Sequence, residues 1–216
     1  MAISEKYGVN IEVVDDAGEQ AVRCLELFID TAGQTICEQG RFTVAISGGS
    51  TPRRFFELLG SGCRQEVDWD RVHVFWVDER AVGPEHPDSN FRAANELFLS
   101  KVDIPDGNVH HIPTGGGDPA EAAEAYQMQI RQFFGLGQKH IPHLDMIFLG
   151  MGSEGHTASL FPHQDVSADE GRLVRAVHTG ADMHDRVTLT PQVLKAARQL
   201  VVLVSGHGKA RTLKEV

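Results

Sequence analysis

The residues best suited to chemistry lie in one short glycine-rich segment, GMGSEGHTASLFP at 150–162. His156 can accept a proton near neutral pH, as a general base in hydrolysis must. Glu154 lies two residues earlier, close enough to orient or polarise the imidazole. A histidine that is hydrogen-bonded for structural reasons alone fits the same segment, so the spacing by itself leaves both interpretations open.

A second segment, SGGSTP at 47–52, places two glycines and three hydroxyl residues between an apolar run and an amphipathic one. Its glycines would let the backbone approach a phosphate, which the free N–H groups and the dipole of a following helix favour. A tight turn before a well-capped helix is the alternative. The segment matches neither a Walker A loop nor a dinucleotide fingerprint, so no nucleotide is expected. The candidate phosphate-binding residues are Ser47, Gly48, Gly49, Ser50 and Thr51.

Two further segments place charges directly after apolar runs. In SGHGKA, Lys209 stands at the start of an expected helix, where the helix dipole disfavours a cation unless an anion binds nearby. In VDERAV, Arg80 is suited to clamp a phosphate while Asp78 faces the substrate. The alternative for Lys209 is a solvated lysine on the surface. The alternative for VDERAV is a set of charges that pair with one another and bind no ligand.

Metal and disulfide chemistry have little support in the sequence. No acid converges in the sequence on His110, His111, His140, His143, His178 or His184. The pair in HIPH has no evident third ligand, so neither a metal site nor a cofactor is expected. Cys24, Cys37 and Cys63 are odd in number and form no C-x-x-C pair, which predicts buried free thiols.

Length and composition indicate one domain over 1–216, because 41% of the 216 residues are apolar and no change of composition divides the chain. The net charge of −10 opposes binding to nucleic acid or an anionic membrane, so any bound anion needs a local basic site. The first residues lack a secretory signal and no apolar run is long enough to span a bilayer, which predicts a cytoplasmic protein.

The elements that must position these residues recur as apolar runs, polar glycine-rich turns and amphipathic segments. This alternation predicts an α/β fold with an open, mainly parallel, doubly wound sheet, whose nearly continuous apolar strands are covered by helices on both faces. Helices are expected at 17–38 and 119–134, the second with Asp118 as its N-cap. The four polar turns leave the carboxyl ends of strands, where ligands bind in such sheets, so we expect them to share one site. The expected strands are FTVAI, VHVFWV, LDMIFL and LVVLV.

Five motifs in order, SGGSTP, VDERAVGPEHPDSNFRAANELF, FLGMGSEGHTASLFP, DRVTLTPQVLKAA and SGHGKA, closely resemble the 6-phosphogluconolactonase family. The resemblance runs from the first strand to the end of the chain. It implies a Rossmann-like fold of the sugar-phosphate isomerase type. It also implies hydrolysis of 6-phospho-D-glucono-1,5-lactone to 6-phosphogluconate in the pentose phosphate pathway, without metal or cofactor.

By the same resemblance, individual residues take family roles. His156 matches the general base that activates water, Arg80 and Lys209 match phosphate-binding positions, and Arg186 in DRVTLT matches an arginine at the rim of the site. Backbone N–H groups of residues 150–155 are candidate donors to the oxyanion that forms during attack on the lactone.

Two features depart from the family pattern. Glu154 stands where the family usually has aspartate, which keeps the charge but lengthens the side chain by one methylene. The chain also stops at LKEV, inside its last expected helix, whereas relatives continue. C-terminal elements present in relatives are therefore expected to be missing.

Two other functions stay open. A glucosamine-6-phosphate deaminase or isomerase uses an aspartate like Asp78, but resembles this chain less, because Leu160 and Phe161 replace its Asn-Glu pair and a phenyl ring cannot transfer protons. A non-catalytic sugar-phosphate-binding module of a regulator would need a DNA-binding segment, for which too few residues precede the first strand. Monomer and small homo-oligomer are both compatible with the sequence.

Overall fold

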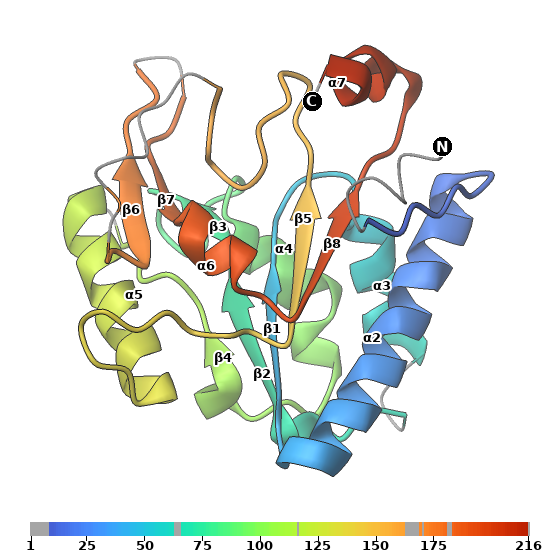
Figure 1. Ribbon diagram of the computed structural model, residues 1–216, viewed down its shortest axis with the longest axis horizontal. Coiled ribbons are helices and arrows are strands. Elements are labelled where there is room, and N and C mark those ends of the chain that lie inside the picture. Colours follow the sequence, from blue (N-terminus) through green and yellow to red (C-terminus); the bar gives the residue numbers. More distant parts are fainter. Residues whose placement is uncertain are drawn as a thin grey trace.

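The computed structural model describes residues 9–62, 66–115, 117–162, 169, 171–180 and 183–215. At its centre is a parallel sheet of strand order β4-β2-β1-β5-β8 (Figure 1). All four strands expected from the sequence are present, and the prediction of an open, mainly parallel sheet is confirmed. The strands are β1 (Phe42–Ile46), β2 (Val72–Trp76), β4 (Val109–His110), β5 (Met146–Gly150) and β8 (Gln199–Leu203).

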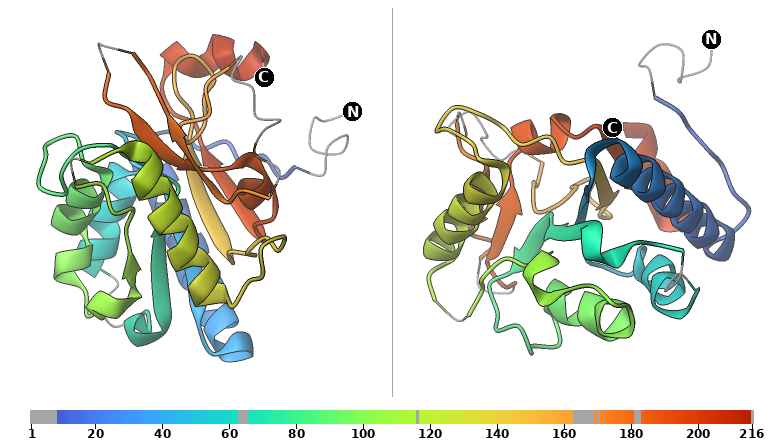
Figure 2. Two further views of the ribbon diagram at one scale, coloured as in Figure 1. Left: turned by 90° about the vertical axis from the view of Figure 1, so that its left-hand side faces the viewer. Right: turned by 90° about the horizontal axis from the view of Figure 1, so that it is seen from below.

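Helices cover both faces of the sheet, as Figure 2 shows from two directions. On one face, Phe55 of α3 packs against Phe148 of β5, with ring centroids 4.8 Å apart. On the other face, Phe133 of α5 packs against Phe75 of β2 at 5.2 Å. Phe148 and Phe75 pair with neighbouring residues of β1, so their side chains leave opposite faces. The helices are α2 (Ala17–Gln39), α3 (Arg53–Gly62), α4 (Asn90–Leu97), α5 (Pro119–Phe134), α6 (Pro191–Lys195) and α7 (Ala210–Glu215).

The helix ends follow from local chemistry. The Asp16 carboxylate accepts the first free N–H groups of α2, and Gly40 ends that helix in the left-handed conformation, at φ +79°. Asp118 caps α5 as predicted, with a proline next to it. Pro52 precedes α3, and its carbonyl accepts the N–H of Phe56 at 2.9 Å. Single 3₁₀ turns connect other elements at Trp69–Arg71, Leu99–Lys101, Asp106–Asn108 and His207–Lys209.

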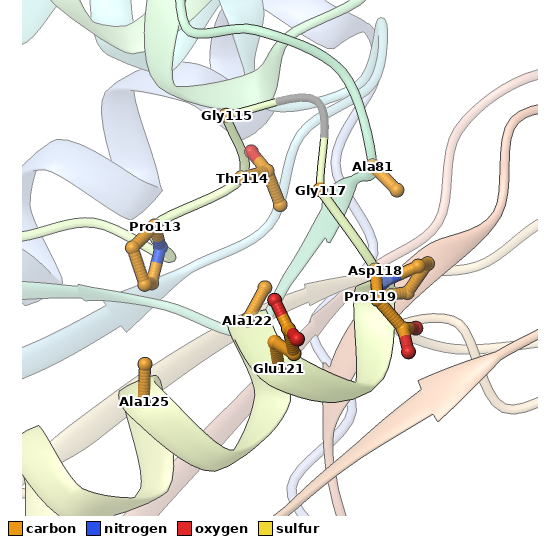
Figure 3. Close-up of a pocket in the computed structure, with 10 residues that line it drawn as sticks. All are labelled: Ala81, Pro113, Thr114, Gly115, Gly117, Asp118, Pro119, Glu121, Ala122 and Ala125. Carbon is orange, nitrogen blue, oxygen red and sulfur yellow. The ribbon is translucent and has the colours of Figure 1, made fainter.

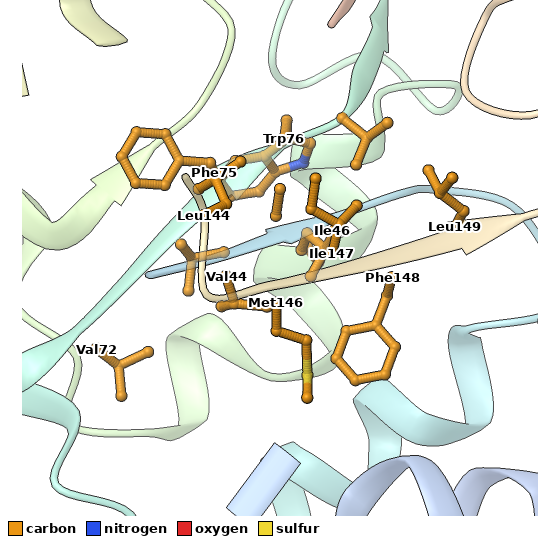
Figure 4. Close-up of a cluster of buried hydrophobic side chains, with 14 of the residues drawn as sticks. Val44, Ile46, Val72, Phe75, Trp76, Leu144, Met146, Ile147, Phe148 and Leu149 are labelled. Carbon is orange, nitrogen blue, oxygen red and sulfur yellow. The ribbon is translucent and has the colours of Figure 1, made fainter. Parts of the chain in front are cut away.

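The hydrophobic core lies on the central strands, whose side chains interdigitate in Figure 4. Every residue of β1 is buried, and removing the side chains of Phe42, Val44 and Ile46 from water contributes about 1.5–3 kcal/mol each. Because β4 has only two residues, the backbone of Trp76 extends past it. The buried Tyr126 hydroxyl accepts the Trp76 N–H and donates to the Trp76 carbonyl, which satisfies both groups.

A second, antiparallel sheet of order β3-β7-β6 stands beside the carboxyl edge of the main sheet and was not expected from the sequence. Its strands are β3 (Asp78–Arg80), β7 (Arg186–Leu189) and β6 (Val174–Val177). The segment DER, which the sequence presents as a charged turn, is therefore a short strand. It follows β2 directly, so the chain passes from one sheet to the other at Val77, whose N–H bonds to Ile46 and whose carbonyl bonds to Leu189.

Three expectations need correction or fall outside the structure. Cys24 is buried, and burial raises its thiol pKa to about 11, but Cys37 is exposed on α2. Cys63 lies outside the described residues. Strand β8 is not covered on both faces, because Leu200 and Val202 are 43% and 47% exposed. Among the helices of the described ranges, none has the length and apolar character needed to cross a membrane.

Candidate active site

The four predicted loops meet at the carboxyl edge of the main sheet, toward which β5 and β8 point in Figure 1. The Lys209 ammonium donates to Thr51 Oγ1 at 3.5 Å, a contact across 158 positions of the chain. Ser159 Oγ donates to Asp78 Oδ2 at 2.6 Å, which joins the histidine loop to β3. The charges of Asp78 and Lys209 both act on the pKa of His156. One site therefore contains residues from all four loops.

Strand β3 separates its three charges by alternation. Residues 78 and 80 leave one face and Glu79 leaves the other. The Glu79 carboxylate is buried and accepts the N–H groups of Asn90 and Phe91, both at 2.7 Å, and the Ser89 hydroxyl at 3.1 Å. Burial raises the pKa of Glu79, and these N–H groups oppose that shift. Glu79 thus caps the N-terminus of α4, and its charge acts on the site through space, where it raises the pKa of Arg186.

The opposite face of β3 forms one wall of the site together with β7. Asp78 pairs with Thr188 and Arg80 pairs with Arg186 in the antiparallel ladder, and paired residues share a face. Ser159 closes this wall, because its N–H bonds to Thr188 Oγ1 at 3.3 Å while its hydroxyl holds Asp78. A carboxylate, two guanidinium groups and two hydroxyls are thereby fixed by a single strand register.

The two arginines of this wall have unused hydrogen-bonding capacity. Arg80 Nη1 donates to the Asp88 carbonyl at 2.5 Å, but the buried Nε atoms of Arg80 and Arg186 have no hydrogen-bond partner in the described part of the chain. Burial, and then the charge of Arg80, lower the pKa of Arg186. Two adjacent guanidinium groups with free donors favour a multiply charged anion such as a phosphate between them.

The SGGST loop divides its residues between structure and site. A Cβ on Gly48 would lie 1.8 Å from Asn90 Oδ1, so this glycine makes room for the Asn90 side chain. The same Asn90 amide donates to the Asp78 carbonyl at 2.8 Å. Gly49 has φ +100°, which favours glycine. Ser47 is buried, and its Oγ has no hydrogen-bond partner among the described residues.

The other two candidates of this loop lie nearer the solvent. Ser50 is exposed, and Thr51 is half-buried and in contact with Lys209. The hydroxyl of Thr51 and the ammonium group of Lys209 thus lie together, and the charge of Lys209 acts on His156.

His156 is held by the fold of its own loop. The Gly152 N–H donates to the His156 carbonyl at 2.8 Å, and a Cβ on Gly152 would lie 2.1 Å from His156 Cε1. The Phe161 ring packs against the imidazole, with centroids 4.7 Å apart. Burial first, and then the charge of Arg186, lower the pKa of His156 below its ordinary value. The imidazole is therefore neutral at pH 7 and able to accept a proton.

Glu154 is exposed, and the structure gives it no hydrogen bond to His156 within the described residues. Its charge acts through space and raises the pKa of His156, against the lowering by burial.

Two residues beyond the histidine, Ala158 has φ +54°, the one positive value at a described non-glycine residue. This left-handed turn delivers Ser159 to Asp78.

Sequence reasoning missed Asn90, Ser159 and Thr188, which position the site. All three lie inside motifs that were singled out, but their roles depend on the unexpected strand pair β3 and β7. It also missed the acids that meet two outlying histidines. His178 Nδ1 lies 2.8 Å from Asp185 Oδ2, and the His184 imidazole contacts Asp88, so the expectation that no acid converges on them is wrong.

A separate pocket lies at the N-terminus of α5, between Ala81 and the loop around Thr114 (Figure 3). Its charged lining residues are Asp118 and Glu121, and no cation is among the residues that line it. An anionic sugar phosphate is better matched by the arginine wall than by this acidic pocket.

Known proteins resemble this chain over most of its length. A family model described as glucosamine-6-phosphate isomerases/6-phosphogluconolactonase matches residues 15–216. A 6-phosphogluconolactonase from Nostoc sp. is 39% identical over 206 residues, which cover 95% of this chain and 84% of the relative. One from Synechocystis sp. is 41% identical over 198 residues, covering 92% and 79%.

Solved structures agree with these relatives. A 6-phosphogluconolactonase from Thermotoga maritima is similar with a TM-score of 0.81 and 30% identity, covering 94% of this chain and 87% of that one. A monomeric glucosamine-6-phosphate deaminase has a TM-score of 0.79 at 16% identity, covering 96% and 86%, which shows a shared fold alone.

Proposed function

The chain belongs to the glucosamine-6-phosphate isomerase/6-phosphogluconolactonase family, and we propose that it hydrolyses 6-phospho-D-glucono-1,5-lactone to 6-phosphogluconate. The observation that carries this proposal is a neutral imidazole fixed beside a wall of unsatisfied arginines. A base next to an anion site is what hydrolysis of a phosphorylated lactone requires.

In the proposed reaction, His156 removes a proton from water as the water oxygen bonds to the lactone carbonyl carbon. The resulting tetrahedral oxyanion collapses, the bond from that carbon to the ring oxygen breaks, and the imidazolium returns its proton to the leaving oxygen. Water is consumed and the base is regenerated, so no metal or cofactor enters the balance. The lowered pKa of His156 keeps the base form available at neutral pH.

Donors for the oxyanion come from the same loop. The N–H groups of Gly152 and Gly155 are already bonded to backbone carbonyls. Gly150 and Met151 belong to β pairs with Leu203 and Thr157. This leaves the N–H groups of Ser153 and Glu154 as the candidates, two and three residues before the base. Glu154 then contributes through its backbone as well as through the charge that acts on His156.

The phosphate is proposed to lie between Arg80 and Arg186 on one side and Lys209 with Thr51 on the other. Their positive charges would neutralise a dianion, and the free Nε atoms match its oxygens. Ser47, in the same loop as Thr51, offers a buried hydroxyl. Asp78, held by Ser159, faces the sugar hydroxyls as an acceptor.

Phe161 argues against deamination, because the ring that packs on His156 offers no proton-transferring group. The location of the protein in the cell is a separate question. The cytoplasmic location stays a prediction, since a relative from Arabidopsis thaliana is named chloroplastic.

The test is the release of acid from freshly generated 6-phosphogluconolactone, with the spontaneous rate subtracted. We expect clear acceleration by the wild type, and a loss in kcat of about 10²- to 10⁴-fold in His156→Ala. Arg186→Gln should act mainly on KM. The matched control His178→Ala, at an exposed histidine with no role in the proposed reaction, should leave the rate unchanged. Absence of acceleration by the wild type, or ammonia release from glucosamine 6-phosphate, would refute the proposal.

A further inference from the structure

We propose that His86, Asp88 and His184 bind a divalent transition-metal ion, such as Zn²⁺, at the rim of the site. His86 and Asp88 belong to the loop between β3 and α4, and His184 precedes β7. One ligand atom from each residue lies within 4.8 Å of the other two. The proposal concerns a site apart from the base and the arginine wall, and does not depend on the lactone reaction.

The distances within this rim cluster are close to those around a bound ion. Asp88 Oδ2 lies 3.2 Å from His184 Nε2 and 3.9 Å from His86 Nδ1. The two imidazole rings stand edge to face, with centroids 5.2 Å apart. Ligands on tetrahedral zinc at bond lengths of about 2.0–2.1 Å lie about 3.3 Å from one another. Small side-chain rotations therefore bring the three atoms onto one ion.

Each half of the rim cluster is held by its own segment. The His86 N–H bonds to the Gly83 carbonyl and the Ser89 N–H bonds to the His86 carbonyl, both at 2.9 Å. Arg80 holds the Asp88 carbonyl, so the carboxylate stays next to the imidazoles. The backbone of His184 is tied by the hydroxyl of Thr179, which donates to the His184 carbonyl at 2.9 Å. Because these backbone segments are already ordered, binding an ion requires a smaller loss of conformational entropy.

His86 directs its Nδ1 atom toward Asp88. This nitrogen lies 3.1 Å from the Asp88 backbone nitrogen, whose N–H it accepts, so its lone pair faces the rim cluster. Binding a metal exchanges that single hydrogen bond for a coordinate bond. The three side chains are 41%, 56% and 45% exposed, which leaves room for water to complete the coordination.

The ligand set selects the class of metal. Two imidazoles and one carboxylate favour Zn²⁺, Co²⁺, Ni²⁺ or Cu²⁺ over Mg²⁺ and Ca²⁺, which prefer oxygen ligands. The positive charges of Arg80 and Arg186 nearby oppose any cation, so only ions that bind imidazole strongly are expected to occupy the site.

The experiment is calorimetric titration of the protein with Zn²⁺ in a Cys37→Ser background, which removes the exposed thiol among the cysteines that the structure describes. We expect one site per chain in this background. His184→Ala and His86→Ala should each weaken it by tenfold or more, because losing even a group that only supports a ligand costs about 10- to 100-fold. The matched control is His178→Ala, which removes a histidine that is more exposed than His86 and His184 and is paired with a different acid.

Thermal unfolding of each variant verifies that it is folded, and Mg²⁺ in place of Zn²⁺ should give no binding. A Co²⁺ titration adds a readout, since bound Co²⁺ absorbs visible light with an intensity that reports its coordination. The proposal is overturned if Zn²⁺ binds the Cys37→Ser protein no more tightly than the two histidine variants. It is also overturned if His178→Ala weakens binding as much as His184→Ala does. None of these readouts depends on hydrolysis.

Discussion

Two glycine-rich loops lie at the same edge of the sheet, and in each of them a glycine leaves space for a neighbouring side chain. The two side chains have different roles. Gly48 lacks a Cβ so that Asn90 can lie against it, and Gly152 lacks one so that the His156 ring can. Asn90 then holds the backbone at Asp78, whereas His156 stays free at Nδ1 within the described structure. The first glycine serves the framework and the second serves the reacting group. A glycine-rich turn at a strand end is thus not in itself a phosphate cradle.

The sharpest test of this contrast is Gly152→Ala. The new methyl group overlaps the imidazole, so the ring must leave its position while the core is untouched. We expect kcat/KM to fall about 10²-fold or more, close to the loss in His156→Ala, with little change in stability. Gly150→Ala is the control, because a Cβ there meets nothing within 4 Å. Wild-type activity in Gly152→Ala would contradict the role of this glycine.

The counterpart, Gly48→Ala, should act mainly on stability. Its methyl group displaces the Asn90 amide, and overpacking of this kind costs about 1–3 kcal/mol in the free energy of unfolding, measured by urea denaturation. In an Asn90→Ala background the same substitution should cost clearly less, because the three atoms it meets are gone. An unchanged cost in the two backgrounds would show that the amide is not what Gly48 accommodates.

A smaller effect is expected in the pH dependence of kcat/KM, which reports the protonation of His156 in the second loop. Burial and Arg186 lower the pKa of His156, so the neutral base persists below pH 6.5 and is lost only when more acid protonates it. We expect kcat/KM to stay level from pH 7 to 6.5 and to fall below that range by about tenfold per pH unit. Arg186→Gln removes one cause, so its acid limb should move to higher pH. If the acid limb of Arg186→Gln stays in place or moves to lower pH, Arg186 is not a cause of the lowered pKa of His156.

The smallest expected effect is at Ala158. Its left-handed backbone costs about 1–2 kcal/mol, and glycine removes that cost but adds about 0.5–1 kcal/mol of chain entropy. Ala158→Gly should therefore raise the free energy of unfolding by a few tenths to about 1 kcal/mol. The same substitution within α5, Ala125→Gly, should lower it. Thermal melts that move in one direction for both would argue against strain in the histidine loop.

The sequence was sufficient for the main sheet and for the meeting of its loops. Continuous apolar runs such as FTVAI identify buried parallel strands, and capping residues such as Asp118 set helix starts, because both signals are local. The family was predicted from five motifs in the sequence, and the comparisons confirmed the family. The roles of individual site residues stay predictions, supported by their convergence.

The features that the sequence did not predict depend on contacts between residues far apart in the chain. Strand β3 has three charged residues and no apolar alternation, so nothing local distinguishes it from a turn. Only its pairing with β7 shows that Glu79 faces away from Arg80. Similarly, 96 positions separate the contacting side chains of His184 and Asp88. No spacing rule links them.

The contact of Lys209 with Thr51 has a consequence for the newly made protein. The two residues are 158 positions apart, and a ribosome that adds about 5–20 residues per second needs about 8–30 s to pass from one to the other. During that interval β1, α3 and β2 can already assemble around their aromatic side chains. The anion site still lacks its lysine, so a nascent chain can have an ordered core well before it can hold a phosphorylated substrate.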